Sequence, residues 1–224
     1  MRTALGAPDR GGNAVRASLL AAIAAAVALA VYGLVRYPGL REDAGTWLAL
    51  ATFLGIALVY VAAALSLSRG RTPAAAIARG FGCAGGLVVG AGWLLIVAPV
   101  SKTFVFVPLA LALTAPVATA ALAGRASGDA PTGRAAALWS GLVGGLCAFI
   151  ILAVVAYSGD GRPYDPQLIR DFQASGSHDL AAYAVGDSLG GALGMLLVIP
   201  VVALALGSLA SAWTAATRRA PQRR

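Results

Sequence analysis

Long uncharged, apolar stretches alternate along this chain with short segments that carry charge. An α-helix needs about 20 apolar residues to cross the hydrocarbon core of a bilayer, because each residue advances the helix by about 1.5 Å. The pattern therefore predicts an all-α, polytopic membrane protein with a bundle of six transmembrane helices. The six apolar stretches are each 19 to 30 residues long and cover 17–35, 44–68, 80–101, 103–124, 135–159 and 188–217.

The boundaries of the expected helices follow from these stretches and from the aromatic and charged residues that flank them. Residues 1–16 precede the single transmembrane domain, which covers 17–217, and 218–224 form a basic tail. The first apolar stretch exceeds the core of a secretory signal, about 7 to 15 residues, so we expect it to stay as a helix. The expected spans are about 17–37, 46–68, 77–99, 103–124, 135–157 and 184–213.

The distribution of charge predicts the orientation of the bundle. Hydrophobic residues make up 59% of the chain and charged residues 12%, with a net charge of +8. Of the 17 basic residues, 12 lie in the N-terminal segment, the second and fourth connections and the tail. The other side has five basic residues and seven of the nine acids. By the positive-inside rule both termini are expected in the cytoplasm, in a plasma membrane of the bacterial type. The bilayer, not nucleic acid, is the expected partner of this basic chain.

Small residues recur at four-residue intervals in three of the expected helices, which places them on one face of each helix. Such faces let backbones approach closely, so we expect the third, fifth and sixth helices to form the tight centre of the bundle. Contact with a second copy or with another membrane protein is the alternative use of these faces. The residues expected to pack are Gly82, Gly86 and Gly90, then Gly141 and Gly145, then Gly186, Gly190 and Gly194.

The longest connection, residues 158–183, is expected outside the cell and has a helix of its own. Asp165 is a good N-cap, Pro166 suits the first helical position, and Gly176 suits the end. The apolar side chains of this short helix fall on one face, which predicts a helix lying at the membrane interface. Ser177 is expected to cap the helix that leads into the sixth span.

Candidate chemistry is sparse and gathers near the same connection. His178, Asp179 and Asp187 form a speculative site at the outer mouth of the bundle, and Asp187 lies closest to the membrane. A solvated acidic surface is the favoured interpretation, because no ligand spacing of a known metal site appears. No catalytic, cofactor or metal site is expected, since the only histidine lies outside and no motif of a known reaction is found.

Two functional hypotheses remain open from the sequence. The first is a non-enzymatic accessory or interaction subunit of the membrane, whose outer connection contacts a partner. The alternative is a small carrier or channel for an uncharged or lipophilic solute, which needs no charged residue within the bilayer.

Overall fold

The structure is a computed structural model that describes residues 10–42, 44–70, 72–97, 106–159 and 165–219. Across these residues the chain forms α-helices joined by short connections, together with one short 3-10 helix, and no strand. The elements are α1 (Arg10–Arg36), η1 (Pro38–Arg41), α2 (Ala44–Leu67), α3 (Pro73–Val97), α4 (Phe106–Ser127), α5 (Ala130–Tyr157), α6 (Pro166–Ser175) and α7 (Leu180–Arg219).

Five of the helices in the described residues are long and apolar enough to cross a membrane, namely α1, α2, α3, α5 and α7. The expectation of a helical, multi-pass membrane protein is therefore confirmed. The helix α4 covers most of the fourth expected span but is not among these five, so the sixth crossing stays a prediction. The longest helix is α7, whose 40 residues measure about 60 Å, twice the thickness of the hydrocarbon core.

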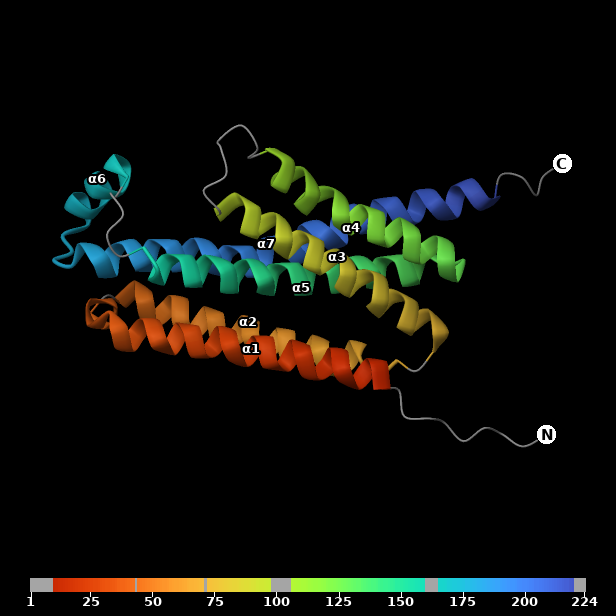
Figure 1. The fold of residues 1–224 in the computed structure, drawn as a ribbon, viewed down its shortest axis with the longest axis horizontal. Helices are drawn as coiled ribbons and strands as arrows, with labels where there is room; N and C mark the ends of the chain where they lie inside the picture. Colours follow the sequence, from red (N-terminus) through yellow and green to blue (C-terminus); the bar gives the residue numbers. More distant parts are fainter. Residues whose placement is uncertain (1–9, 43, 71, 98–105, 160–164, 220–224) are drawn as a thin grey trace.

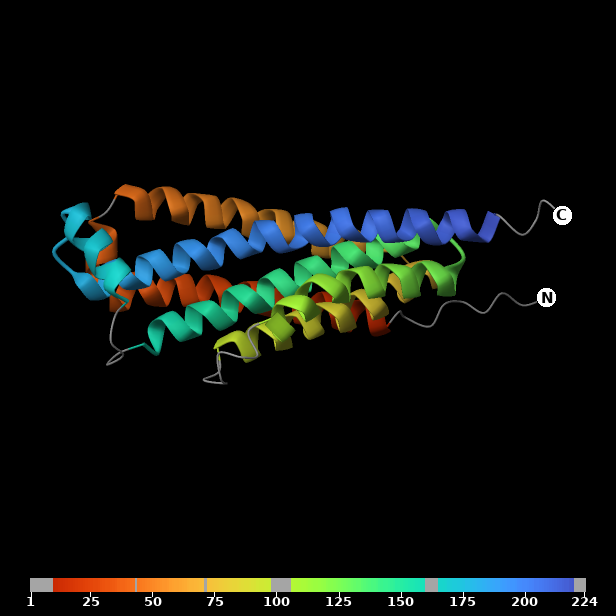
Figure 2. The same ribbon diagram turned by 90° about the horizontal axis from the view of Figure 1, so that it is seen from above.

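The long helices run roughly antiparallel and form three layers (Figures 1 and 2). The central layer is α5 with α7, one outer layer is α3 with α4, and the other is the hairpin of α1 and α2. The first two layers approach each other most closely, whereas the hairpin touches the centre more sparsely, α1 against α5 and α2 against α7. Helix α1 begins and α7 ends at the same end of the bundle, and α6 lies at the other end, here called the α6 end.

Close approach between α3 and α5 follows from the glycines of α3. Added Cβ atoms at Gly82 and Gly86 would collide with Trp139 and Val143 of α5, and one at Gly90 would lie 2.8 Å from the Cβ of Cys147. The three α5 residues share the four-residue spacing of the glycines, so each side chain fills the place of a missing one. Trp139 is 1% exposed as a result.

A second row of small residues on α5 meets α7. A Cβ at Gly141 would lie 2.6 Å from the Cα of Pro200 and 2.8 Å from the Cβ of Ala203. One at Gly145 would lie 3.3 Å from the carbonyl oxygen of Met195, and one at Gly207 would collide with Ala137. The expected centre of the third, fifth and sixth spans thus exists, and α5 is its middle helix.

The glycines expected to pack in the sixth span behave differently. Gly190 and Gly194 have open space where a Cβ would stand, with no atom within 4 Å, and Gly186 meets only Leu40, at 3.1 Å. The packing expectation for Gly190 and Gly194 therefore needs correction. The glycine contacts between α7 and α5 lie further along the helix, at Met195, Pro200, Ala203 and Gly207.

Helix α6 has the expected bounds and caps. The Asp165 carboxylate accepts a hydrogen bond from the Gln167 backbone N–H at 2.8 Å, and Gly176 closes the helix with a φ of 71°. The cap of α7 differs from the expectation. Asp179, not Ser177, accepts from the backbone N–H of Ala182, at 3.0 Å, so α7 begins before the expected span. The expected outer connection is shortened accordingly, and Tyr183 already belongs to α7.

Candidate functional site

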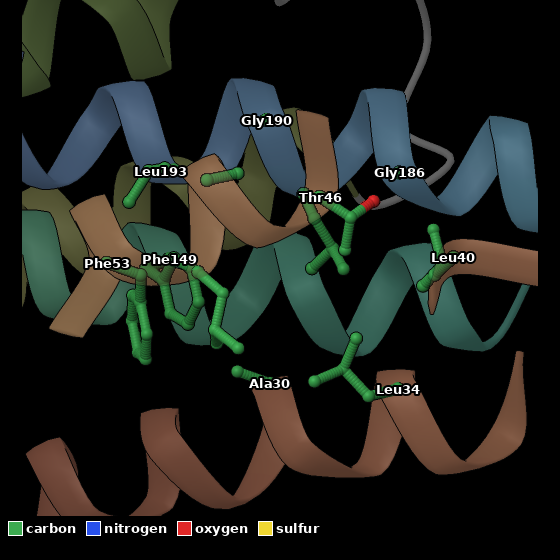
Figure 3. A pocket seen from close by; sticks show the side chains of 12 residues that line it. Ala30, Leu34, Leu40, Thr46, Phe53, Phe149, Gly186, Gly190 and Leu193 are labelled. Carbon is green, nitrogen blue, oxygen red and sulfur yellow. The ribbon is translucent and has the colours of Figure 1, made fainter. Parts of the chain in front are cut away.

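A hollow between the α1–α2 hairpin and the central layer is here called the hairpin pocket (Figure 3). Its enclosed space is small, about 90 Å³ for the centres of water-sized molecules, within about 560 Å³ that includes the part open to the outside. Figure 3 shows Ala30 and Leu34 of α1 on one wall and the bare turns of α7 at Gly186 and Gly190 on another. The described residues that line it are Ala30, Leu34, Leu40, Thr46, Ala49, Leu50, Phe53, Phe149, Gly186, Leu189, Gly190 and Leu193.

The chemistry of the hairpin pocket is almost wholly apolar. Among the described residues that line it, only Thr46 has a polar side chain and none is charged. The space exists because Gly186 and Gly190 contribute no side chain where the hairpin stands away from α7. A cavity of this kind can accept an uncharged apolar molecule or a hydrocarbon chain, since burial in it costs no desolvation of polar groups.

Two stacked aromatic rings close the inner end of the hairpin pocket. The centroids of Phe53 from α2 and Phe149 from α5 lie 5.1 Å apart, with 19° between the ring planes. Beyond Phe53 a much smaller hollow, with about 10 Å³ for the centre of a water-sized molecule, reaches the buried Tyr60. Phe53 therefore lines both the hairpin pocket and the smaller hollow, which lie one after the other between the hairpin and the central layer.

Two tyrosine hydroxyls tie the hairpin to the central layer. Tyr60 of α2 donates to the carbonyl oxygen of Leu196 in α7 at 2.8 Å. Proline at position 200 has no N–H, so it leaves this Leu196 carbonyl without its usual partner four residues along the helix. Tyr157 of α5 donates likewise to the carbonyl oxygen of Leu29 in α1, at 2.8 Å.

A second hollow, here called the vestibule, lies between α5 and α7 towards α6. It measures about 1180 Å³, counting the part open to the outside. Asp165 and Leu168 reach it from the region of α6, and Trp93 reaches it from α3. The remaining lining residues are Tyr37, Leu152, Val155, Ala156, Gly159, Ala181, Ala184, Val185, Ser188, Gly191, Ala192 and Met195.

The three residues of the speculative outer-mouth site do not come together as a binding cluster. Asp179 is the N-cap of α7, which gives its carboxylate a structural partner. His178 and Asp187 are exposed, and neither lines the hairpin pocket or the vestibule. The described part of the chain has no group of three or more histidine, cysteine or acidic side chains placed to hold a metal ion.

The charge distribution on the fold has one strong asymmetry. Every described acidic residue except Asp129 lies at the α6 end, while Arg16, Arg69, Arg125 and Arg134 lie at the opposite end. Arg79 is 4% exposed within α3 and donates to the carbonyl oxygen of Gly70. Its side chain thereby closes the turn between α2 and α3.

Sequence reasoning missed the hairpin pocket, the vestibule and both tyrosine hydrogen bonds. The only signal for the Tyr60 bond was Pro200, which predicts a bare carbonyl at Leu196 but not its partner. The glycine spacing on α7 predicted close packing and not a hollow. Glycines that face open space have the same spacing as glycines that face a neighbouring helix.

No protein-family model matches the chain, and no match is found to a curated protein or to a solved structure.

Proposed function

We propose that the protein is a non-enzymatic membrane protein with six transmembrane helices that binds an uncharged lipophilic molecule in the hairpin pocket. The observation that carries this proposal is the nearly wholly apolar lining of a hollow between two helix layers. A bilayer supplies hydrocarbon chains and dissolved apolar solutes directly to such a space. Such binding is the first step of a carrier. The apolar pocket therefore favours the carrier function over the accessory function.

The proposed arrangement counts α4 as the sixth crossing and keeps both termini in the cytoplasm of a bacterial-type cell. It is supported by the antiparallel run of the long helices and by the basic residues at the end where α1 begins and α7 ends. In this arrangement α6 and the described acids other than Asp129 face the outside, and α6 lies at the interface. The hairpin pocket then opens in the outer half of the bilayer.

The test is photolabelling in lipid vesicles with an uncharged long-chain alkyl diazirine. Labelling of the peptides that line the hairpin pocket should saturate and should fall when unlabelled hexadecane competes. Gly190→Leu should abolish the saturable part, because the new side chain enters open space in the pocket. Uptake of the same probe by reconstituted vesicles measures passage separately from binding.

Gly55→Leu is the matched control for this substitution. Gly55 also has no atom within 4 Å of its added Cβ, but it lies exposed on α2 and lines neither hollow. The control variant should keep saturable labelling. Saturable labelling that survives in Gly190→Leu would rule out the hairpin pocket as the site.

The accessory function is retained as a second candidate because of α6. None of the residues of this helix is buried, and Ile169 is 37% exposed. The helix carries an opposite-charge pair in sequence, Arg170 and Asp171, that a partner could recognise. A stoichiometric partner that co-purifies in detergent, and is lost on exchanging the two charges, would favour this candidate over the carrier.

A further inference from the structure

The hairpin pocket is closed at both of its ends by buried side chains. At the α6 end Leu40 of η1 is 6% exposed and packs in a buried cluster with Val185 of α7. At the other end Phe53 and Phe149 are buried and stacked on each other. Figure 3 shows Leu40 and this aromatic pair at opposite ends of the space. A molecule that enters lengthwise from the α6 end must therefore displace the buried Leu40 cluster.

The sides of the pocket differ in how tightly they are closed. Between α1 and α5, Tyr157 donates to the Leu29 carbonyl oxygen and lies against the buried Gly33, where an added Cβ would collide with it. On α7, by contrast, Gly190 lines the pocket and is nevertheless exposed. No other described residue that lines the pocket is exposed. The pocket therefore opens beside Gly190, on the side where α2 faces α7.

This opening runs along two helices that are long and apolar enough to cross the membrane. It begins at the contact of Leu40 with Gly186, and it ends where the Tyr60 hydroxyl donates to the Leu196 carbonyl oxygen. Helix α2 bears the exposed Leu48 beside it. An opening within the span of such helices faces hydrocarbon and not water.

Polar groups gather at the α6 end of the opening and are absent from the described lining further in. Arg41 and Glu42 follow Leu40 in the chain, Asp187 follows Gly186, and all three are exposed. The described lining residues carry no charge. An amphiphile at the opening therefore keeps its head hydrated among these side chains while its hydrocarbon chain enters the pocket.

We propose that the hairpin pocket is filled sideways from the bilayer, through the opening between α2 and α7, by one acyl chain of a lipid whose head stays outside. The end of the chain lies against Phe53 and Phe149. From Thr46 to Phe53 the pocket follows α2 for about 10 Å, so it holds the terminal part of a long chain. This inference rests on the function proposed above and adds to it the route of entry and the class of ligand.

The experiment compares two photoprobes in vesicles of phosphatidylcholine that contain the full chain. Both carry a diazirine near the terminal methyl group of the same alkyl chain. One is the free alkane, and the other is a diacylglycerol whose uncharged polyethylene glycol head is too large for the pocket. Mass spectrometry locates the labelled residues. Phe149 is the reporter, because it is 3% exposed and bulk lipid does not reach it.

Both probes should label Phe149, because a head that stays outside the opening does not hinder the chain. Moving the diazirine of the headed probe next to its head should shift the label from Phe149 to α7 around Gly190. Gly190→Leu should abolish labelling of Phe149 by both probes, and Gly55→Leu should preserve it. Neither glycine has an atom within 4 Å of an added Cβ, so neither substitution introduces a clash.

The two probes separate failure of this inference from failure of the proposed function. Labelling of Phe149 by the alkane alone would overturn sideways filling by a lipid chain and leave the apolar site in place. Labelling by neither probe would overturn both proposals. Labelling by the headed probe that persists in Gly190→Leu would show that the chain does not enter beside Gly190.

Discussion

At the scale of single residues, the hydroxyl of Tyr60 compensates for a donor that Pro200 removes from α7. Tyr60→Phe should lower the free energy of unfolding by about 1 kcal/mol, because the Leu196 carbonyl would be left unpaired in an apolar setting. Thermal unfolding in detergent measures this loss. Pro200→Ala restores a backbone N–H four residues after Leu196, so the same tyrosine substitution should cost less in that background.

The double-mutant cycle formed by these two substitutions separates the hydrogen bond from packing. A positive coupling between Tyr60 and Pro200 is expected, since each substitution alters the partner of the same carbonyl. Equal losses on Tyr60→Phe in both backgrounds would show that the hydroxyl contributes nothing through Leu196.

Asp129 caps α5 at the end of the bundle opposite α6, and its carboxylate accepts from the Thr132 backbone N–H at 2.8 Å. Interactions with Thr132 hold the pKa of Asp129 below its ordinary value, and the Ser127 hydroxyl adds to the effect, while slight burial opposes it. The charged cap therefore stabilises the fold above about pH 4, and its contribution is lost as the pH falls through the lowered pKa.

Two substitutions at this cap test that account. Asp129→Ala should cost about 1 kcal/mol near neutral pH, whereas Asp129→Asn should cost less because asparagine also caps helices well. Melting temperatures of the unaltered protein and the asparagine variant, measured between pH 7 and pH 3, should converge as the carboxylate becomes protonated. A difference that stays constant over this range would contradict a stabilising charge at position 129.

At the scale of helices, the contrast between packed and unpacked glycines gives a direct stability prediction. Gly86→Leu should lower the melting temperature strongly, because the new side chain would collide with Val143 and the backbone of α5. Gly194→Leu should change it little, since the added atoms meet open space. Thermal unfolding in detergent compares the two, and equal sensitivity would mean that α3 and α5 are not in close contact.

Helix positions could be predicted from sequence because the apolar stretches and caps are local signals. Asp165, Pro166 and Gly176 fixed the bounds of α6 in this way, and the glycines of α3 matched their contacts with α5. Gly190 and Gly194 could not be distinguished from them, because spacing shows which face is bare but not whether a neighbour covers it. Trp139 lies near the start of the fifth expected span, where tryptophans favour the membrane interface, but the missing side chains of α3 make room for it in the core.

At the scale of the whole molecule, the hairpin of α1 and α2 packs unevenly against the central layer of α5 and α7. This uneven packing explains why the positions of the hollows could not be predicted from the sequence. Helices α1 and α2 carry large side chains towards α5 and α7, such as Phe53 and Tyr60, and these hold the layers apart. Small residues instead bring α3, α5 and α7 together. Such a difference between layers depends on which helices become neighbours, and periodicity within one helix does not contain that information.

The last prediction concerns the orientation of the whole bundle, which rests on 12 basic residues against five. Single cysteines are placed in a protein with Cys83 and Cys147 replaced by alanine. Cysteine at Ser177, exposed between α6 and α7, should react in intact cells with a thiol reagent that cannot cross membranes. Cysteine at Ala126, exposed near the end of α4 at the opposite end of the bundle, should react only after the cells are opened. The two positions serve as controls for each other, because both are exposed and differ only in the end of the bundle on which they lie. The opposite pattern would place the termini outside and open both hollows towards the cytoplasm, and labelling of both positions from outside would exclude the proposed arrangement of crossings.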